Sequence, residues 1–520
     1  MARTYLELVD AQATARPDCV AFVNTRGERI TYAQLKAQSD ALARWIAANP
    51  AIPQGVPLIV YGHKSPLMLV CFLACAKSGH AYAPVDIVYP AARVESIISQ
   101  LGDTALFDTR GTLRDLLGGD VACPLFGVDA ISEAISAQPS PQAPEPRAVE
   151  DRDPHYVIFT SGSTGTPKGV VVTADCLTNF TNWFCASEFA APGPRIWFDR
   201  APFSFDLSVT DLAGALAAGD TMFALEEEAE ASLALTFEEM GKSGMTDWVS
   251  TPSFLDQCLA DPSFGPDLLP NLRRMIFVGE TLRPETVRRA YERFDDLRIF
   301  NGYGPTESTD MVTLCEITGE MLEADKPLPV GYARPGTRLA VLDPDTLVEV
   351  PRGTAGELFI VGDTVAAGYW GRDDLTQAGF ASCPESIARG ERSYRTGDEA
   401  MLDEEGMLHF HGRLDLQIKL HGFRIELGDI ESVIGALPQV QSVCVLPVNR
   451  DGVISHLVAC VVPAADVQER GFKLSKQLKS LARESLPSYM IPTNFKYLEE
   501  LPLNANGKVD RRALAAIIEG

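Results

Sequence analysis

Short apolar runs alternate with segments of helical periodicity along the first part of the chain. The apolar runs at 56–62, 81–86 and 104–108 are predicted strands, and the segments at 66–78 and 91–102 between them are predicted helices. Strands that alternate with helices are typical of βαβ units around a mostly parallel sheet. The pattern therefore predicts an α/β fold for this part of the chain.

The pattern changes further along the chain. A second α/β unit is predicted from about 195 to 320, and β runs interrupted by glycine predict a smaller β-rich subdomain at about 325–410. The remaining pattern predicts a helix near 428–436, β runs at 440–448 and 455–463, and a helix at 472–485. We therefore predict a large N-terminal core over residues 1–412 and a separate α+β domain of ordinary size over residues 413–520.

Composition and charge narrow the possible partners. The 520 residues are 46% apolar and carry a formal net charge of -25, which is an ordinary composition with an acidic balance. An acidic body does not attract a phosphate backbone, so we expect no nucleic-acid partner. The longest apolar run, 66–76, is too short to span a bilayer, and the acidic N-terminal segment 1–18 does not resemble a signal peptide. We therefore expect no membrane partner.

The cysteines point to a reducing compartment. The chain has 11 of them, scattered and without a Cys-x-x-Cys pair. An odd, scattered set predicts reduced and buried thiols rather than a disulfide or zinc framework. A cytoplasmic location follows from that prediction.

The stretch FTSGSTGTPKG at 159–169 has the glycines, hydroxyls and lysine of a phosphate-binding loop. It is not a Walker A loop, because Pro167 stands where the second glycine is required and Gly169 follows the lysine in place of Ser or Thr. The apolar run 170–172 continues as a strand, so the stretch is predicted to join two strands. Such a loop can close over a triphosphate, whereas the alternative is an ordinary surface loop.

Further motifs follow in order and cover most of the chain. They are FDLS (205–208), NGYGPTE (301–307), GELFIVGDTVAAGY (356–369), YRTGD (394–398), GRLDLQIKLHGFRIELGDIE (412–431) and LPLNANGKVDRRAL (501–514). Together with 159–169 they resemble the adenylate-forming superfamily. Within it the chain is most similar to stand-alone amino-acid adenylation enzymes, such as the D-alanine–carrier protein ligases, and to the adenylation domains of non-ribosomal peptide synthesis.

The resemblance implies a two-step ligase reaction with ATP and Mg²⁺. A carboxylate attacks the α-phosphorus of ATP and pyrophosphate leaves. A thiol then attacks the acyl carbon of the adenylate and releases AMP. Because the sequence ends at Gly520, soon after the last motif, we expect the thiol to come from the phosphopantetheine of a separate carrier protein, or from coenzyme A.

The same resemblance implies an ATP site. Its residues would be Thr160, Ser161, Gly162, Ser163, Thr164, Gly165 and Lys168 for the phosphates, Gly279, Glu280, Thr281, Asn301, Gly302, Tyr303 and Gly304 for adenine, and Asp398 and Arg413 for the ribose. Tyr303 would stack on the base. A buried tyrosine could equally be part of the core.

Three residues would carry the chemistry and one would act as the hinge. Lys508 would bridge the substrate carboxylate and the α-phosphate, as a compact lysine charge suits. Thr306 would bind the α-phosphate and Glu307 would be the magnesium ligand. Asp415 would be the hinge on which the C-terminal domain moves as a cap between the two steps. Taken alone, Glu307 and Lys508 could be solvated loop residues.

An amino-acid pocket is implied by Asp206, which matches the aspartate that binds the substrate ammonium in amino-acid-activating members. Alternatively, Asp206 could have a purely structural role as a helix N-cap or turn residue. The remaining lining would be Phe205, Leu207, Thr210, Ser250, Ile276, Val278, Gly302, Asp310 and Met311. Asp310 stands where the D-alanine ligases have an apolar residue. A second buried acid needs a partner, which predicts a small substrate with a polar or basic side chain.

Other functions remain open at this point. The chain could be a D-alanine–carrier protein ligase proper, for which a small apolar amino acid is the substrate. It could be an acyl- or aryl-CoA ligase, against which Asp206 argues. It could also be a nucleotide-binding module without catalysis, although Lys508, Glu307 and Asp398 are all present.

Overall fold

The computed structural model describes residues 3–119, 121–137, 144–162, 166–187, 195–323, 326–415, 417–450, 453–465, 467, 471–503 and 509–519. The chain divides into two units that are described separately below. The first comprises Met1–Asp86, Gln100–Phe159 and Gly169–Leu414, and the second comprises Ile87–Ser99, Thr160–Lys168 and Asp415–Gly520.

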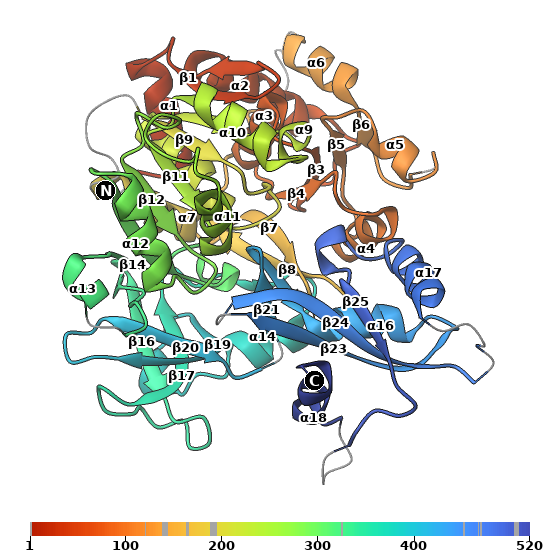
Figure 1. Ribbon diagram of the computed structural model, residues 1–520. Coiled ribbons are helices and arrows are strands. Elements are labelled where there is room, and N and C mark those ends of the chain that lie inside the picture. Colours follow the sequence, from red (N-terminus) through yellow and green to blue (C-terminus); the bar gives the residue numbers. More distant parts are fainter. Residues whose placement is uncertain are drawn as a thin grey trace. The chain divides into compact units, whose positions relative to one another are not determined.

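Two large sheets and the helices between their strands form most of the first unit (Figure 1). One sheet has the order β15-β14-β13-β12-β11-β9-β10-β1-β2. Its strands are β1 (Val20–Asn24), β2 (Arg29–Thr31), β9 (Ile196–Asp199), β10 (Thr221–Ala224), β11 (Asp247–Ser250), β12 (Arg274–Phe277), β13 (Arg298–Tyr303), β14 (Thr313–Glu316) and β15 (Tyr332–Ala333). Strands β1 and β9–β13 run parallel, and antiparallel strands close both edges.

The other large sheet has the order β18-β8-β7-β4-β3-β5-β6. Its strands are β3 (Leu58–Gly62), β4 (Tyr82–Asp86), β5 (Leu106–Asp108), β6 (Leu125–Phe126), β7 (Pro154–Thr160), β8 (Lys168–Thr173) and β18 (Gly368–Tyr369). Strands β4, β3 and β5 are parallel neighbours, as the alternating pattern predicted. The stretch 159–169 does join two adjacent strands, β7 and β8. The α/β prediction is confirmed.

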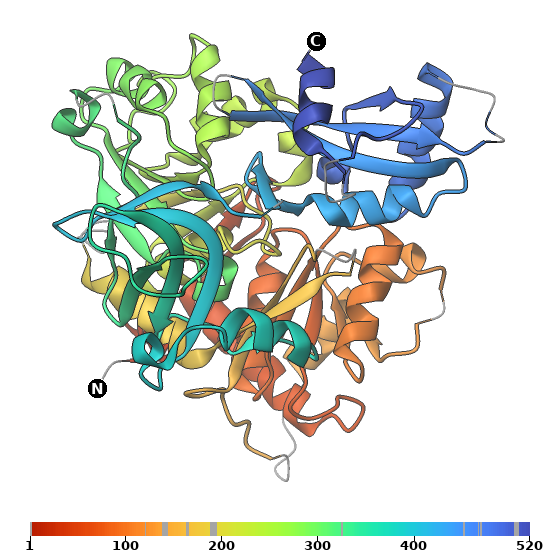
Figure 2. The same cartoon turned by 90° about the horizontal axis from the view of Figure 1, so that it is seen from below.

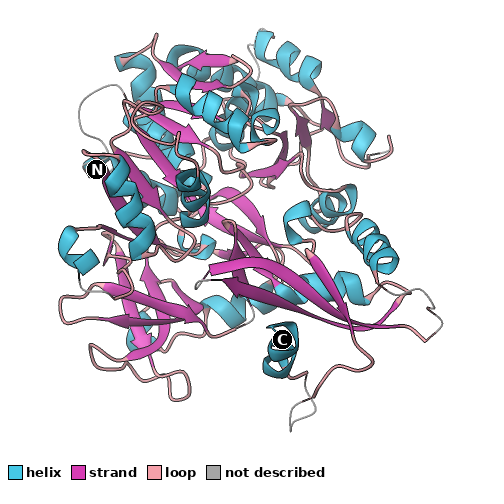
Figure 3. Ribbon diagram, in the orientation of Figure 1, coloured by secondary structure: helices cyan, strands magenta, loops and turns pink. Residues whose placement is uncertain are grey.

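Figure 3 shows the helices in cyan, and those at Pro66–Lys77 and Ala91–Leu101 match the helices predicted at 66–78 and 91–102. Helices in this part of the chain are α1 (Tyr5–Ala15), α2 (Tyr32–Ala48), α3 (Pro66–Lys77), α4 (Ala91–Leu101), α5 (Leu113–Leu116), α6 (Val128–Ser136), α7 (Ala174–Ala186), α8 (Leu216–Ala218), α9 (Glu227–Glu230), α10 (Leu233–Ser243), α11 (Pro252–Ala260), α12 (Pro284–Arg293) and α13 (Gly319–Glu323), with a π-helix at Thr210–Ala215 and a 3-10 turn at Thr306–Ser308.

Helix α3 shows how local sequence fixes an element. The Ser65 side chain caps its N-terminus by accepting from Met68 N, and Pro66 occupies its first turn. Residues Met68–Lys77 are buried, so the apolar run is a core helix. Within the described part of the chain, no helix combines the length and apolar character that a bilayer span would require.

A smaller antiparallel sheet of order β16-β17-β19-β20 completes the first unit. Its strands are β16 (Thr337–Leu342), β17 (Ala355–Gly362), β19 (Ser393–Leu402) and β20 (Leu408–Arg413), and the short helices α14 (Asp373–Phe380) and α15 (Glu385–Ala388) lie between β17 and β19 in the sequence. This is the β-rich subdomain expected at 325–410.

The second unit has its own sheet and core. Its elements in the last hundred residues are β21 (Gln417–Leu420), β22 (Phe423–Glu426), α16 (Leu427–Gly435), β23 (Val440–Arg450), β24 (Val453–Pro463), α17 (Phe472–Ala482), a 3-10 turn at Ser488–Met490, β25 (Asn494–Tyr497) and α18 (Arg511–Glu519). Alternate residues of β23 and β24 enter two clusters, one with α16 and α17 and one with α18. Figure 2 shows these helices around the strands. Helix α17 ends at Ala482, three residues before the predicted end at 485.

All 11 cysteines are free thiols. Six are buried, four are half-buried and Cys19 is exposed, so the prediction of buried thiols holds for six of the eleven. Cys19 lies just before β1 in a turn rather than within the core pattern.

A buried ion pair joins the two large sheets of the first unit. Lys64 follows β3, and its Nζ donates to Asp199 Oδ2 at 2.7 Å and to the Asp199 carbonyl at 3.0 Å at the end of β9. Both side chains are fully buried. Burial raises the pKa of Asp199, and Lys64 opposes that shift.

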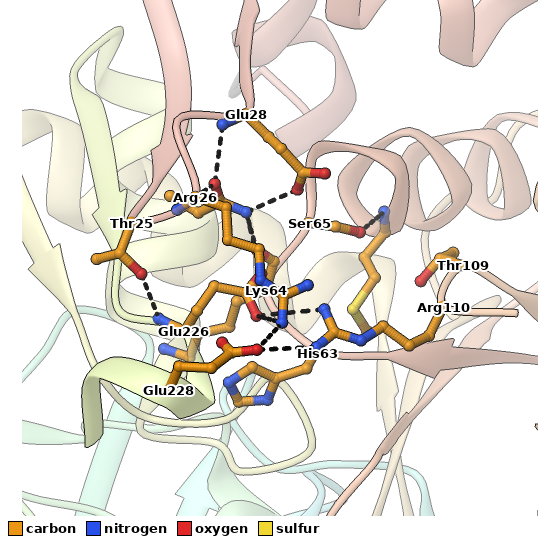
Figure 4. Close-up of polar contacts among 12 residues, drawn as sticks. Thr25, Arg26, Glu28, His63, Lys64, Ser65, Thr109, Arg110, Glu226 and Glu228 are labelled. Carbon is orange, nitrogen blue, oxygen red and sulfur yellow. Dashed lines mark hydrogen bonds and ion pairs between the residues drawn. The ribbon is translucent and has the colours of Figure 1, made fainter. Parts of the chain in front are cut away.

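Further polar residues lie around Lys64 at the carboxyl ends of the strands, among them Arg26, Arg110 and Glu226 (Figure 4). Asn24 Nδ2 donates to the Lys64 carbonyl at 3.1 Å and to Glu226 Oε1 at 3.0 Å. Arg26 and Arg110 approach the other Glu226 oxygen at 3.6 and 3.4 Å. The ends of β1, β3, β9 and β10 are therefore held in one polar cluster.

We expect Lys64→Met to destabilise the protein strongly. The substitution leaves Asp199 buried without its cation, which costs about 3–5 kcal/mol in comparable pairs. The double variant Lys64→Met/Asp199→Asn removes the uncompensated charge and should recover most of that loss. Thermal unfolding midpoints of the three proteins check this, and a double variant no more stable than the single one would contradict it.

Candidate functional site

Three neighbouring parallel strands of the first unit end at the same edge of their sheet. Ser250 ends β11, Val278 and Gly279 follow β12, and Tyr303 ends β13. Ligands of open α/β sheets bind beside the carboxyl ends of the strands. These four predicted site residues therefore lie at the edge of the sheet where this kind of fold places ligands.

Tyr303, Asp398 and Arg413 form one hydrogen-bonded group. Arg413 Nη1 donates to Asp398 Oδ1 at 2.8 Å, and the Tyr303 hydroxyl donates to Asp398 Oδ2. Residues 398 and 413 are cross-strand partners in β19 and β20. Burial, followed by the charge of Asp398, raises the pKa of Tyr303 well above its usual value. The phenol therefore stays protonated and can only donate to the carboxylate.

The Tyr303 ring lies beside Phe410, with ring centroids 5.9 Å apart and planes inclined by 30°. Tyr303 is thus packed on one face by protein. Asn301 Nδ2 donates to the Pro329 carbonyl at 2.8 Å, and Asn301 Oδ1 has no hydrogen-bond partner among the described residues. A buried acceptor without a partner at a strand end is a position where a ligand donor fits.

A tight turn after β13 brings Thr306 and Glu307 to two different partners. Thr306 Oγ1 donates to Asp206 Oδ2 at 2.6 Å, and the Tyr369 hydroxyl donates to Glu307 Oε1 at 2.6 Å. Glu307 is fully buried, whereas Asp206 is half-buried. The turn therefore connects the predicted ammonium-binding carboxylate to the predicted phosphate-binding hydroxyl through one hydrogen bond.

The turn leaves no room for a side chain at its start. A Cβ on Gly304 would lie 1.6 Å from the Asp310 carbonyl oxygen and 3.0 Å from Val312 N. Thr309 and Asp310 both have positive φ, 61° and 60°. Such strained backbone persists where the surroundings determine it, and it is common at ligand sites.

Asp310 has protein partners of its own. It is buried, and Thr210 Oγ1 donates to its Oδ2 at 2.5 Å. Burial lowers the pKa of Arg334 to about 10, and Asp310 is among the groups that oppose this shift, so a guanidinium lies within electrostatic reach. Asp310 therefore does not depend on a substrate cation for its burial.

The other predicted pocket residues divide into two groups. Ile276, Val278 and Met311 belong to the largest apolar core of the unit, and Ser250 is also buried. Gly302 is packed closely, since a Cβ there would lie 3.0 Å from Met311 Sδ. Phe205 and Leu207 are half-buried on either side of Asp206. Among the predicted pocket residues, Phe205, Asp206 and Leu207 are therefore the partly exposed ones, and the others are buried.

The segment 279–281 lies at the end of β12. Gly279 has φ +97°, a conformation that favours glycine. Glu280 Oε2 accepts from Ser253 N at 3.0 Å, which ties this segment to the start of α11, and Thr281 is exposed. All three residues are therefore at least partly exposed to solvent.

The predicted phosphate loop is described in part within the second unit. Ser161 Oγ donates to the Arg424 carbonyl and accepts from Glu426 N, both at 3.1 Å, and Lys168 Nζ lies 3.9 Å from Glu426 Oε1. Thr160 Oγ1 is 3.5 Å from the Lys168 carbonyl, and a Cβ on Gly162 would lie 2.1 Å from the Thr166 carbonyl oxygen. Ser163, Thr164, Gly165 and Lys508 lie outside the described residues.

The division between the two units falls between Leu414 and Asp415, beside the predicted hinge residue. Asp415 Oδ1 accepts from Gln417 N at 3.0 Å, and this bond starts the β21–β22 hairpin. Sequence reasoning assigned no role to Tyr369, which donates to Glu307, or to Arg334, whose charge is influenced by Asp310. Tyr369 ends one of the quoted motifs, which was the available signal, whereas Arg334 had none.

The described residues supply one carboxylate, that of Glu307, for the predicted magnesium site. Among the described residues, no group of three or more His, Cys, Asp or Glu side chains could hold a metal ion. A metal at Glu307 would take that one carboxylate from the protein and its other oxygens from phosphate and water. Mg²⁺ is bound in this way, so Glu307 is compatible with it.

Comparison with known proteins gives matches along the whole chain. The model of the AMP-binding enzyme family matches residues 9–370, and that of the AMP-binding enzyme C-terminal domain matches residues 429–508. The D-alanine–D-alanyl carrier protein ligase of Bacillus licheniformis is 41% identical over 98% of both chains, and that of Bacillus anthracis is 40% identical with the same coverage. The structure of holo-PA1221, an NRPS protein with adenylation and PCP domains, is 28% identical with a TM-score of 0.81, covering 99% of this chain and 84% of that one.

We expect Gly304→Ala to disrupt the turn that carries Thr306 and Glu307. The added Cβ would meet backbone at 1.6 Å, which no side-chain rotation can relieve. The variant should unfold several degrees earlier and lose pyrophosphate exchange with ATP. Gly319→Ala is the matched control, because a Cβ there meets nothing within 4 Å. Equal melting temperatures for the Gly304 variant and the parent protein would contradict the prediction.

Proposed function

The chain belongs to the AMP-binding enzyme family of adenylate-forming ligases, and from this premise we propose that it activates a small amino acid with ATP and transfers it to the phosphopantetheine thiol of a separate carrier protein. In the first step a substrate carboxylate oxygen bonds to the α-phosphorus while the bond to pyrophosphate breaks. In the second step the thiolate attacks the acyl carbon and AMP leaves. Phosphoryl transfer of this kind needs positioning and charge neutralisation more than covalent help from the protein.

The single observation that carries the proposal is the hydrogen bond between Asp206 and Thr306, at 2.6 Å. It puts a half-buried carboxylate next to the hydroxyl proposed for the α-phosphate. An α-amino acid has its ammonium two bonds from the carboxyl carbon, so one molecule can reach both groups. A plain acyl or aryl acid would leave Asp206 without a cation, which disfavours the CoA-ligase alternative.

The remaining roles are proposed from position and chemistry. Asp398, fixed by Arg413 and Tyr303, would accept the ribose hydroxyls, and the segments 279–281 and 301–304 would border adenine. The loop 160–168 and Lys508 would bind the phosphates and the substrate carboxylate. Mg²⁺, held by Glu307, would neutralise phosphate charge. Asp415 would be the hinge between a core of residues 1–412 and a mobile cap of residues 413–520, and the free thiols support work in the reducing cytoplasm.

The substrate side chain is proposed to be small and apolar, with D-alanine first, as in the relatives' names. The argument for a polar or basic side chain required Asp310 to lack a partner. Thr210 is hydrogen-bonded to Asp310, so that argument loses its premise. The apolar residues Ile276, Val278 and Met311 would then enclose a methyl group.

A pyrophosphate-exchange panel tests this choice of substrate. We expect the highest turnover with D-alanine, lower turnover with L-alanine and glycine, and none with propionate, which lacks the ammonium. Highest turnover with serine or 2,3-diaminopropionate would return Asp310 to the role of substrate partner. Exchange with propionate alone would overturn the amino-acid proposal.

Asp206→Asn should weaken amino-acid activation selectively. A hydrogen bond to a charged group contributes about 1.5–3 kcal/mol, which corresponds to roughly a 10- to 150-fold loss of kcat/KM for the amino acid. The KM for ATP should change little. Asp345→Asn, at an exposed loop position, is the matched control. An equal rise in both KM values would indicate a folding defect instead of a lost ammonium contact.

A further inference from the structure

Helix α17 presents a basic face that the fold does not use. Leu474, Leu478 and Ala482 are buried in the core of the second unit. Arg483 follows the last residue of the helix as its C-cap and keeps helical backbone angles. Phe472, Lys476 and Arg483 are therefore spaced at i, i+4 and i+11 on one face, away from the buried positions. All three are exposed, and Phe472 is 83% exposed.

The charges on this face are concentrated and of one sign. From Gly471 to Arg483 the sequence has four cations, Lys473, Lys476, Lys479 and Arg483, and no acid. Lys479 is committed to the fold, since its Nζ donates to the Thr493 carbonyl at 2.5 Å and lies over the Phe495 ring. Lys476 and Arg483 make no ion pair with any residue that the structure describes. Like charges this close on a helix are destabilising unless something offsets them.

This face contrasts with the charge of the rest of the protein. Residues 415–520 contain 12 Lys and Arg against 12 Asp and Glu, so the whole formal excess of 25 acids lies in residues 1–414. A cationic patch in an otherwise strongly acidic chain selects acidic partners, because complementary fields speed and orient encounter. The exposed aromatic ring adds an apolar anchor of the kind found in protein interfaces.

From these observations we infer that the face formed by Phe472, Lys476 and Arg483 is a docking surface for the carrier protein. The carrier would present acidic side chains to Lys476 and Arg483 and an apolar side chain to Phe472. The three residues span about 16 Å along the helix, which suits one helix or loop of a small partner. The inference rests on the proposed function, because it names the surface that receives the acceptor of the second step.

Two variants test it, Lys476→Glu/Arg483→Glu and Phe472→Ser, each measured in three assays. The first assay is pyrophosphate exchange with ATP, which involves no carrier. The second is aminoacyl transfer to free pantetheine, which supplies the thiol without a protein. The third is transfer to the phosphopantetheinylated carrier of the Bacillus licheniformis relative, at low and high salt. Arg114→Glu/Arg352→Glu, an equal charge change at exposed positions of the first unit, is the matched control.

We expect the charge-reversal variant to raise the KM for the carrier about tenfold at low salt and less at 0.5 M NaCl, because electrostatic docking is screened. Phe472→Ser should raise it at both salt concentrations. The first two assays should be unchanged, and the control should behave as wild type. Conservative exchange of the two cations, Lys476→Arg/Arg483→Lys, should preserve the KM.

Three results would overturn the inference. An unchanged carrier KM in both variants would exclude this face as the docking surface while leaving the proposed function intact. Equal losses in all three assays would mean that the face supports the protein's own folding or domain movement. Binding of wild type to phosphatidylglycerol vesicles, lost in the variants at unchanged carrier KM, would assign the face to a lipid surface. A wild type that charges pantetheine but no carrier would overturn the proposed function itself.

Discussion

A carboxylate removed from water needs a cation or a hydrogen-bond donor beside it, and this requirement organises the first unit. Lys64 donates a hydrogen bond to Asp199, and Arg413 and Tyr303 both donate to Asp398. The carboxylates of the turn after β13 accept hydrogen bonds from hydroxyl groups. In each case the partner comes from a different element, so each pairing also fixes two elements in register. The contacts that stabilise the buried carboxylates therefore also hold together the elements that carry them.

The site combines two kinds of support. The backbone of residues 304–310 is fixed by close approach and by two residues with positive φ. The side chains it presents are then oriented by distant donors, Tyr369 for Glu307 and Thr210 for Asp310. A rigid turn with oriented side chains suits a reaction whose catalysis depends on positioning.

The sequence was informative where local pattern decides structure. Alternating apolar runs predicted strands β3, β4 and β5 and helix α3, and four residues that the family resemblance implied for the site lie at the ends of β11, β12 and β13. It could not predict pairings across long separations, such as Lys64 with Asp199, which are 135 residues apart. No local pattern encodes which buried cation meets which buried acid. The interpretation of Asp310 failed to anticipate Thr210 for the same reason, since 100 residues separate them.

The turn after β13 also limits how such an enzyme can be redesigned. Tyr303, proposed to border adenine, and Asp310, proposed to line the side-chain pocket, lie at the two ends of a single short loop in which the backbone at Gly304 closely approaches Asp310. Altering the loop to admit a bulkier amino acid would therefore also displace the Tyr303 ring. In the proposed site, a replacement at Val278, which follows β12 and lies outside this loop, would change the pocket without removing the Thr210 donor that Asp310 needs.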